Sequence, residues 1–322
     1  MSAIAETDIT FVIQGPVSYF DGVNVTDKCV ASIQSLFPDS PVILSTWATD
    51  YVNQGICILV NEDPGEITTA NWYFKNYNRM MVATHNGIQR STTKFVARIR
   101  SDYWLDCTSD LKKKIGIIQA EGFDGLMGKI LMAMSYDRHP LFAYYPSDLF
   151  HCGFRADMLK LWNGKMVEGF NRHAPQKTME FLPRVIESPF YVCDVSSVMD
   201  YPYHSEQQLC IDFLDELGIE YDFKDHRDTS LIRLVKAYIH LSRYFAACSA
   251  HELGLRSYKH PVPLSPADTR TWDMAWKATS SRRYYWFFVA HLIGFYIKKQ
   301  RLMASRFIEL QIKNLINRGY KG

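Results

Sequence analysis

The sequence lacks the short motifs that identify several common classes of enzyme and metal protein. Its seven cysteines include no Cys-x-x-Cys pair, so neither a zinc knuckle nor a dithiol redox centre is indicated. It also contains no Gly-x-Gly-x-x-Gly, no phosphate loop with Gly-Lys-Ser and no Gly-x-Ser-x-Gly. Any nucleotide or catalytic site must therefore be built in another way.

A charge excess of either sign is also missing. The chain has 36 Lys and Arg against 34 Asp and Glu, so nucleic acid is not expected as its main partner. The cysteines are odd in number and far apart, which favours reduced thiols in an intracellular protein. Residues 1–8 lack a basic n-region and an apolar h-region, so we expect no secretory signal and a cytoplasmic location.

What the sequence does have is an alternation of strand patterns and helix patterns. Short apolar runs bounded by Gly and Pro predict strands, and apolar residues at helical spacing predict helices. The expected strands cover 9–13, 42–47, 56–60, 95–99, 123–130 and part of 145–154, and the expected helices cover 26–36, 74–89, 156–162 and 206–217. This order implies an α/β fold with a mixed, mostly parallel sheet flanked by helices.

The chain is expected to divide into two parts. Residues 1–228 carry the alternating pattern and form the predicted catalytic domain. From Leu231 onward the pattern is largely helical, so residues 229–322 are predicted to form a helical C-terminal extension.

The most informative stretch runs from Lys94 to Tyr103. Its apolar residues predict a buried strand that ends in Arg100-Ser101-Asp102. Arg98 falls inside this strand, and unpaired charge is costly in a protein interior. Open α/β sheets bind ligands at the carboxyl ends of their strands. The stretch therefore indicates a metal or diphosphate site, with a solvated turn after a core strand as the alternative.

Several phrases together resemble the WavE family of bacterial lipopolysaccharide-synthesis proteins, over roughly residues 8 to 215. They are Phe11–Val17, Phe37-Pro38 with Val42–Trp47, Asp63-Pro64-Gly65, Asn78-Arg79, Arg98–Asp102 and Ser205-Glu206-Gln207. Proteins of this kind are regarded as glycosyltransferases of lipopolysaccharide core or surface-polysaccharide assembly. The resemblance implies a fold similar to the GT-A type, in which an α/β sheet binds a nucleotide-sugar donor.

For the donor, the resemblance implies a site along the carboxyl ends of the first strands. The residues concerned are Gln14, Gly15, Pro16, Thr46, Trp47, Asn78, Arg79, Arg100, Ser101 and Asp102. Gly15 permits close approach of the backbone, although Gln14-Gly15-Pro16 also suits an ordinary turn. Trp47 could stack on the base or cap the core, and Arg79 could reach the diphosphate or remain solvated.

Asp102 is the expected metal ligand. One carboxylate with phosphate oxygens and water can complete the shell of Mg²⁺ or Mn²⁺, the expected cofactor. The usual Asp-x-Asp pattern of GT-A enzymes is broken here, because position 100 is Arg. Arg100 could itself hold phosphate in bidentate fashion, which leaves a metal-free site open.

The acceptor side is assigned to two later segments. His151 and Gly153 are expected to contact the acceptor, with a purely structural His151 as the alternative. Glu206 at a helix start, or else Asp148, is expected to be the catalytic base that deprotonates the acceptor hydroxyl. A helix-dipole role explains Glu206 equally well. An inverting reaction follows from this choice of base.

The C-terminal region contains the apolar stretch 284–297, with Arg282-Arg283 before it and Lys298-Lys299 after it. Fourteen residues are too few to span a bilayer, which needs about 20. Basic flanks with Trp and Tyr suit a helix on an anionic membrane face, and a core helix is the alternative. A peripheral position on the inner face of the cytoplasmic membrane is thus one expectation.

Together these features predict a glycosyltransferase that moves a sugar from a nucleotide-sugar donor to a glycan or glycolipid acceptor. Two other classes remain open. A nucleotidyl- or phosphotransferase could use the same acidic strand end, and a membrane-associated assembly factor would need no catalytic residues at all.

Overall fold

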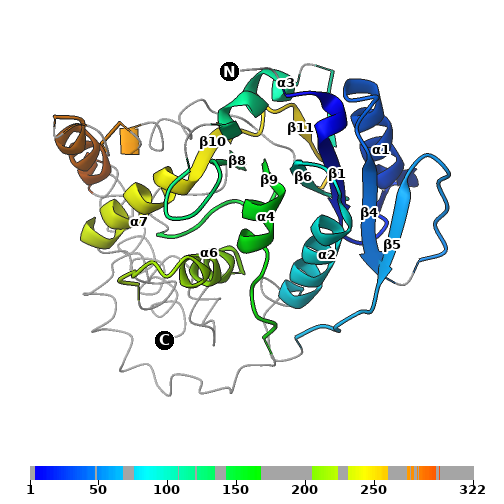
Figure 1. Cartoon of the computed structure of the whole chain (residues 1–322), viewed down its shortest axis with the longest axis horizontal. Coiled ribbons are helices and arrows are strands. Elements are labelled where there is room, and N and C mark those ends of the chain that lie inside the picture. The colour runs from blue at the N-terminus through cyan, green and yellow to red at the C-terminus, as the bar shows by residue number, and fades with distance from the viewer. Residues whose placement is uncertain are drawn as a thin grey trace, which may run out of the picture.

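The structure is a computed structural model. It describes residues 4–47, 49–67, 76–107, 109–119, 122–134, 143–167, 205–223, 231–259, 274–275, 277–278, 281, 283–294 and 297. At its centre lies a seven-stranded sheet of order β10-β8-β9-β6-β1-β4-β5 (Figure 1). The strands are β1 (Ile9–Gln14), β4 (Val42–Trp47), β5 (Cys57–Asn61), β6 (Phe95–Arg100), β8 (Ile130–Met134), β9 (Phe150–Phe154) and β10 (Phe245–Ser249).

The sheet is mixed but mostly parallel. Strands β5, β4, β1 and β6 run side by side in one direction, and β10 is parallel to β8. Strand β9 is antiparallel to both of its neighbours, β6 and β8. The predicted fold class, an α/β protein with a mixed, mostly parallel sheet flanked by helices, is confirmed.

Helices cover both faces of the sheet. They are α1 (Val25–Leu36), α2 (Tyr77–Arg90), α3 (Leu111–Lys114), α4 (Arg155–Leu161), α6 (Ser205–Glu216) and α7 (Leu231–Tyr244). Alternate residues of a strand point to opposite faces, so β1 contributes to two cores. Phe11 and Ile13 pack with α1 and α3, whereas Val12 packs with α2, α4, α6 and α7.

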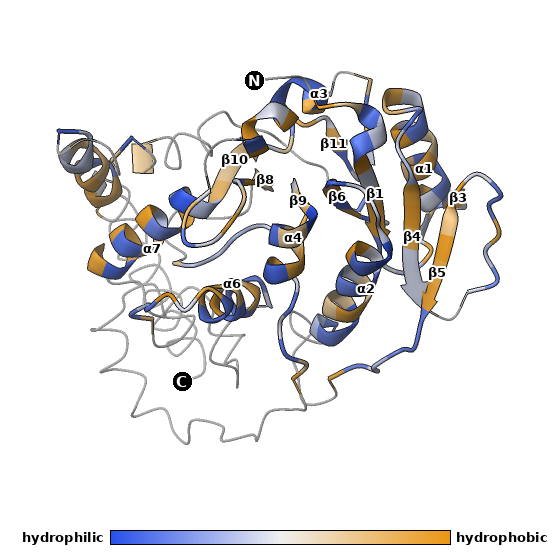
Figure 2. Cartoon of the chain, in the orientation of Figure 1, coloured by the Kyte–Doolittle hydropathy of each residue, from blue (hydrophilic) through white to orange (hydrophobic). Residues whose placement is uncertain are grey.

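Two local features position the helices next to the strand ends. The Asn24 side chain caps α1 by accepting a hydrogen bond from the Asp27 N–H at 3.0 Å. Gly87 lets α2 approach the sheet, because a Cβ there would collide with Val12 and lie 3.1 Å from Ser45. In Figure 2, β4 changes from orange to pale toward its carboxyl end, where Ser45 and Thr46 replace its apolar residues.

Short strands outside the central sheet form two small two-stranded sheets. A hairpin of β2 (Tyr19–Phe20) and β3 (Val23–Asn24) follows β1, and β7 (Trp104–Leu105) pairs antiparallel with β11 (Leu255–Arg256). The 3-10 helices η1 and η2 cover Glu6–Asp8 and Ile115–Gln119.

One sequence-based prediction is wrong. No strand covers 123–130, because Asp124 and Gly125 adopt positive φ values of 52° and 82° that turn the chain, and β8 begins only at Ile130. The largely helical pattern after Leu231 did not indicate edge strand β10, which residues 245–249 form. Part of the expected C-terminal extension thus belongs to the central sheet, and the division at residue 228 stays a prediction. The expected helix start at 74–75 lies outside the described residues.

Candidate functional site

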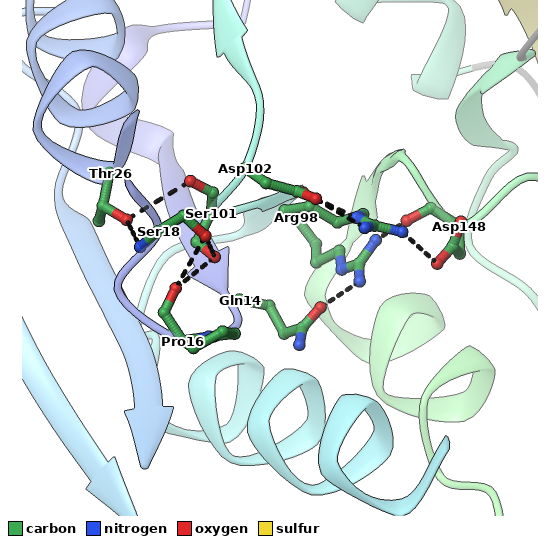
Figure 3. A network of polar contacts seen from close by, with 9 residues as sticks. Gln14, Pro16, Ser18, Thr26, Arg98, Ser101, Asp102 and Asp148 are labelled. Atoms are coloured by element: carbon green, nitrogen blue, oxygen red, sulfur yellow. Dashed lines mark hydrogen bonds and ion pairs between the residues drawn. The ribbon is translucent and has the colours of Figure 1, made fainter. Parts of the chain in front are cut away.

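The residues expected to bind a donor converge where β1 and β6 end. Gln14 and Arg100 are the last residues of these parallel strands and face each other in the register. Because β9 runs antiparallel to β6 and Ile99 pairs with Phe150, the residues just before β9 lie beside the end of β6. This topology brings Asp148 to the same place (Figure 3).

Arg98 is a fully buried cation that forms hydrogen bonds with both the end of β1 and the segment before β9. Its guanidinium donates to the Gln14 side-chain oxygen and to the backbone carbonyl of Asp148. The guanidinium also lies over the Trp162 ring, 4.8 Å from its centroid. Burial lowers the pKa of Arg98 to about 10, so the group is still charged near neutral pH. Sequence reasoning singled out this arginine as unusual but did not place it in the site.

Arg100 lies between two carboxylates. Its Nε and Nη2 donate to the two oxygens of Asp102 at 2.9 and 2.8 Å, and its Nη1 lies 3.2 Å from Asp148 Oδ2. Burial lowers the pKa of Arg100, but the charges of Asp102 and Asp148 outweigh it and raise the pKa well above its ordinary value. The guanidinium is a permanent cation, held in one orientation at the sheet edge.

Asp102 is correspondingly an anion. Burial raises the pKa of its carboxyl group, but Arg100 offsets this effect and Lys259 adds to the lowering, so the pKa lies below its ordinary value. The Asp102 side chain is 18% exposed and the Arg100 side chain 28% exposed. Both side chains are therefore partly exposed to solvent.

The loop after β1 is fixed against the end of β6. Gly15 has a φ of 131°, and a Cβ there would lie 2.6 Å from Ser101 Oγ, so no other residue fits without strain. Ser101 donates from its Oγ to the Pro16 carbonyl at 2.6 Å and from its N–H to the Gln14 carbonyl at 2.9 Å. Thr26, at the start of α1, reaches the Ser101 carbonyl at 3.4 Å. The ends of β1 and β6 therefore lie in direct contact.

Arg79 belongs to a second charged group. It forms a bidentate ion pair with Asp63, at 2.7 and 2.6 Å, and a further contact with Glu66 at 3.2 Å. Its guanidinium lies 5.7 Å from the Trp47 ring centroid. The hydrogen bonds between these two side chains raise the pKa of Arg79 and lower the pKa of Asp63. Asp63 was part of a family phrase, but its pairing with Arg79 was not foreseen.

Thr46 and Asn78 form hydrogen bonds with other buried parts of the protein. Thr46 is fully buried, and its carbonyl accepts a hydrogen bond from Asn61 at 2.8 Å. The Asn78 amide donates to the Val167 carbonyl at 2.8 Å and accepts from the Val167 N–H at 2.9 Å. These contacts give Asn78 a clear structural role, and nothing in its placement tests the contact with a donor that the resemblance implies.

His151 and Gly153 lie inside the sheet. His151 is fully buried next to the Trp162 and Phe245 rings, with centroids 5.5 and 6.1 Å away. Burial lowers the pKa of His151 to about 3, so the ring is neutral. A Cβ at Gly153 would lie 3.3 Å from Ile130. The expectation that these two residues contact an acceptor finds no support in their placement.

Glu206 lies at the start of α6, as expected. It is buried, and Ser205 donates to its carboxylate at 2.7 Å. The next residue, Gln207, donates to the Ala143 carbonyl at 2.8 Å. The start of α6 therefore lies against the segment that leads to Asp148, so the two base candidates come from adjoining segments.

The expected divalent cation fits this site poorly. Both oxygens of Asp102 already accept hydrogen bonds from Arg100, which a cation would have to displace. Across the part of the chain that the structure describes, no three His, Cys, Asp or Glu side chains form a group that could hold a metal. The two carboxylates of this site, Asp102 and Asp148, are both paired with Arg100, so the donor set that a metal would use is already committed to an arginine.

Fold and site together define an α/β protein with a charged site at the carboxyl edge of its sheet, where such folds bind ligands. The model of the WavE lipopolysaccharide synthesis family matches residues 9–260. The chain therefore belongs to this family, as its sequence phrases predicted. No curated protein matches the sequence significantly.

Solved structures give only distant similarity. HddC from Yersinia pseudotuberculosis is 13% identical, with a TM-score of 0.30 over 53% of this chain and 86% of that chain. Its complex with GMP-PN is 11% identical, with the same score and coverage. The 4-diphosphocytidyl-2C-methyl-D-erythritolsynthase from Anaerococcus prevotii DSM 20548 is 8% identical, with a TM-score of 0.34 over 74% and 100%. TM-scores this low support no conclusion about the present chain.

Proposed function

We propose that this lipopolysaccharide-synthesis protein is a glycosyltransferase that uses a nucleotide-sugar donor and a lipopolysaccharide core or surface-polysaccharide acceptor. The observation that carries the proposal is the Arg100 guanidinium, held between Asp102 and Asp148 beside the Gly15 loop. A nucleotide-sugar donor brings a diphosphate, and Arg100 is a permanent cation with a partly exposed side chain at the strand edge where such a group would bind.

Arg100 is assigned the role that a metal has in related chemistry. Negative charge grows on the leaving diphosphate as the glycosidic bond breaks, and a pre-oriented guanidinium stabilises that charge without reorganisation. Asp102 holds the Arg100 guanidinium in position by accepting two hydrogen bonds from it. Because the site suits Mg²⁺ or Mn²⁺ poorly, no step of the proposed reaction depends on a divalent cation.

The remaining roles follow from position. Gly15 lets Ser101 pack closely against the loop that borders the donor site, and Arg79 with Trp47 forms a second contact zone for the nucleotide part of the donor. Asp148 or Glu206 accepts the proton of the acceptor hydroxyl. A single carboxylate that acts as a base, with no covalent intermediate, gives inversion at the sugar carbon.

The direct test is product analysis with purified protein, a panel of nucleotide sugars and truncated lipopolysaccharide as acceptor. The proposal predicts acceptor-dependent release of a nucleoside diphosphate, lost in Arg100→Gln and retained in the control Arg233→Gln. The control residue Arg233 lies on α7. It also pairs with a carboxylate, that of Asp222, at 3.3 Å. Release of pyrophosphate or a nucleoside monophosphate would instead assign a nucleotidyl- or phosphotransferase. No product with any donor, together with wild-type glycan synthesis by cells that carry Asp102→Ala, would favour an assembly factor.

A further inference from the structure

The helix formed by residues 283–294 exposes large apolar side chains instead of the polar face expected of a surface helix. Four of them form what we call the aromatic face: Tyr284, Trp286, Phe287 and Ile293, which are 46%, 61%, 52% and 38% exposed. Ile297 continues it with 48% exposure. Contiguous exposed apolar surface of this kind marks an interaction site.

The opposite side of the same helix is anchored in the core. Phe288 and Leu292 are fully buried, one helical turn apart, and Phe288 packs edge-on against Tyr238 of α7 with centroids 6.0 Å apart. Tyr285 and Val289 pack against the same core. The helix, orange-brown in Figure 1, therefore lies beside α7 with the aromatic face directed away from the core.

Two of the described cations lie beside the aromatic face. Arg283 lies over the Phe287 ring at 5.7 Å, and Lys277 lies 6.0 Å from the Tyr284 centroid. In the sequence, residues 274–308 contain seven Lys and Arg and no Asp or Glu. They are Lys277, Arg282, Arg283, Lys298, Lys299, Arg301 and Arg306. The partner of this surface must therefore tolerate apolar insertion and carry negative charge.

We propose that the aromatic face docks the protein on the surface of an anionic lipid bilayer, with the helix axis parallel to the membrane plane. Trp, Tyr and Phe are favoured at the boundary between head groups and acyl chains, and flanking Lys and Arg bind anionic lipids. Among the described residues no helix is long and apolar enough to cross a membrane, which agrees with a helix that lies on the surface. This proposal does not depend on the catalytic role of Arg100.

Vesicle co-sedimentation of the full chain tests the proposal. We expect binding to vesicles of phosphatidylglycerol and phosphatidylcholine, and much weaker binding to phosphatidylcholine alone. The double variant Trp286→Ser/Phe287→Ser should lower binding roughly tenfold or more, because two inserted aromatic side chains are lost. Arg283→Glu should lower binding roughly tenfold to anionic vesicles only. Ile232→Ser is the matched control, since Ile232 is 71% exposed on α7 outside the aromatic face.

Three outcomes would overturn the proposal. The first is equal binding by the double variant and the Ile232→Ser control. The second is binding that is indifferent to anionic lipid. The third is absence of vesicle binding while sedimentation shows a dimer that the double variant dissociates, which would make the aromatic face a contact between two copies of the chain. Unchanged circular dichroism and melting temperature of each variant establish that it is folded.

Discussion

Arg100 and Asp102 face each other as a bidentate ion pair, with N–O distances of 2.9 and 2.8 Å. The two residues are separated by a single position, at the point where β6 passes into a turn. A carboxylate that would otherwise be available to a cation is thereby committed to an arginine. Nη1 of Arg100 also reaches Asp148 Oδ2 at 3.2 Å, so the pair is part of a three-residue group.

Two substitutions of Arg100 should separate the effect of its positive charge on the rate from the effect of its planar guanidinium shape. We expect Arg100→Gln to lower the rate of sugar transfer by about 10²–10³, the usual effect of removing a group that stabilises charge in the transition state. Arg100→Lys should recover only part of this loss, because an ammonium cannot replace the fork that pairs with Asp102. Initial rates at saturating donor provide the measurement, and full activity of Arg100→Gln would remove Arg100 from the mechanism.

Gly15 should tolerate no side chain. Gly15→Ala places a methyl group against Ser101 at a backbone conformation that alanine rarely adopts, so we expect a loss of about 1–3 kcal/mol in unfolding free energy. Gly22→Ala is the matched control, because Gly22 has a φ of 79° but no atom within 4 Å of the added Cβ. Urea denaturation compares the two variants. Equal losses would mean that the contact with Ser101 contributes nothing.

His151 should make stability depend on pH on the acid side. Its pKa is about 3 in the folded protein and about 6.5 when exposed, so between these values only the unfolded chain binds the proton. Stability from this group is therefore complete above pH 6.5 and decreases as the pH falls toward 3, by up to about 1.4 kcal/mol per pH unit. His240 shifts in the same direction, so the comparison must be made with a variant of His151.

His151→Phe provides that comparison, because the neighbouring Trp162 and Phe245 rings make an apolar replacement acceptable. The difference in unfolding free energy between the wild type and this variant should change with pH from 6.5 downward. A difference that is constant over this range would show that His151 takes up its proton in the folded state.

Asn78 should act on stability and not on donor binding. Asn78→Ala removes both hydrogen bonds to the Val167 backbone, so we expect a loss of about 1–3 kcal/mol. Asn163→Ala, which removes a single exposed contact with Glu216 at 3.3 Å, should change stability by less than about 0.5 kcal/mol. Calorimetric titration with the donor checks the second point. A weakened donor affinity in folded Asn78→Ala would restore its predicted role in the donor site.

The strand ends of the site could be predicted because parallel strands bring their carboxyl ends to one edge. Gly15 and Ser101 lie next to each other at this edge for that reason. The partners of Arg98 could not be predicted, because Gln14 and Asp148 are 84 and 50 positions away along the chain. Strand β10 was missed because Phe245-Ala246-Ala247-Cys248-Ser249 contains no β-branched residue, and its pairing with β8 decides its conformation.

Binding of nucleoside diphosphates in the presence of EDTA tests the central claim most directly. Calorimetric titration of the wild type should show binding of at least one nucleoside diphosphate, with little change when Mn²⁺ is supplied. Arg100→Gln should weaken this binding strongly, and Arg233→Gln should keep it. Binding that requires Mn²⁺ and survives in Arg100→Gln would contradict the account, and would return Asp102 to the role of a metal ligand.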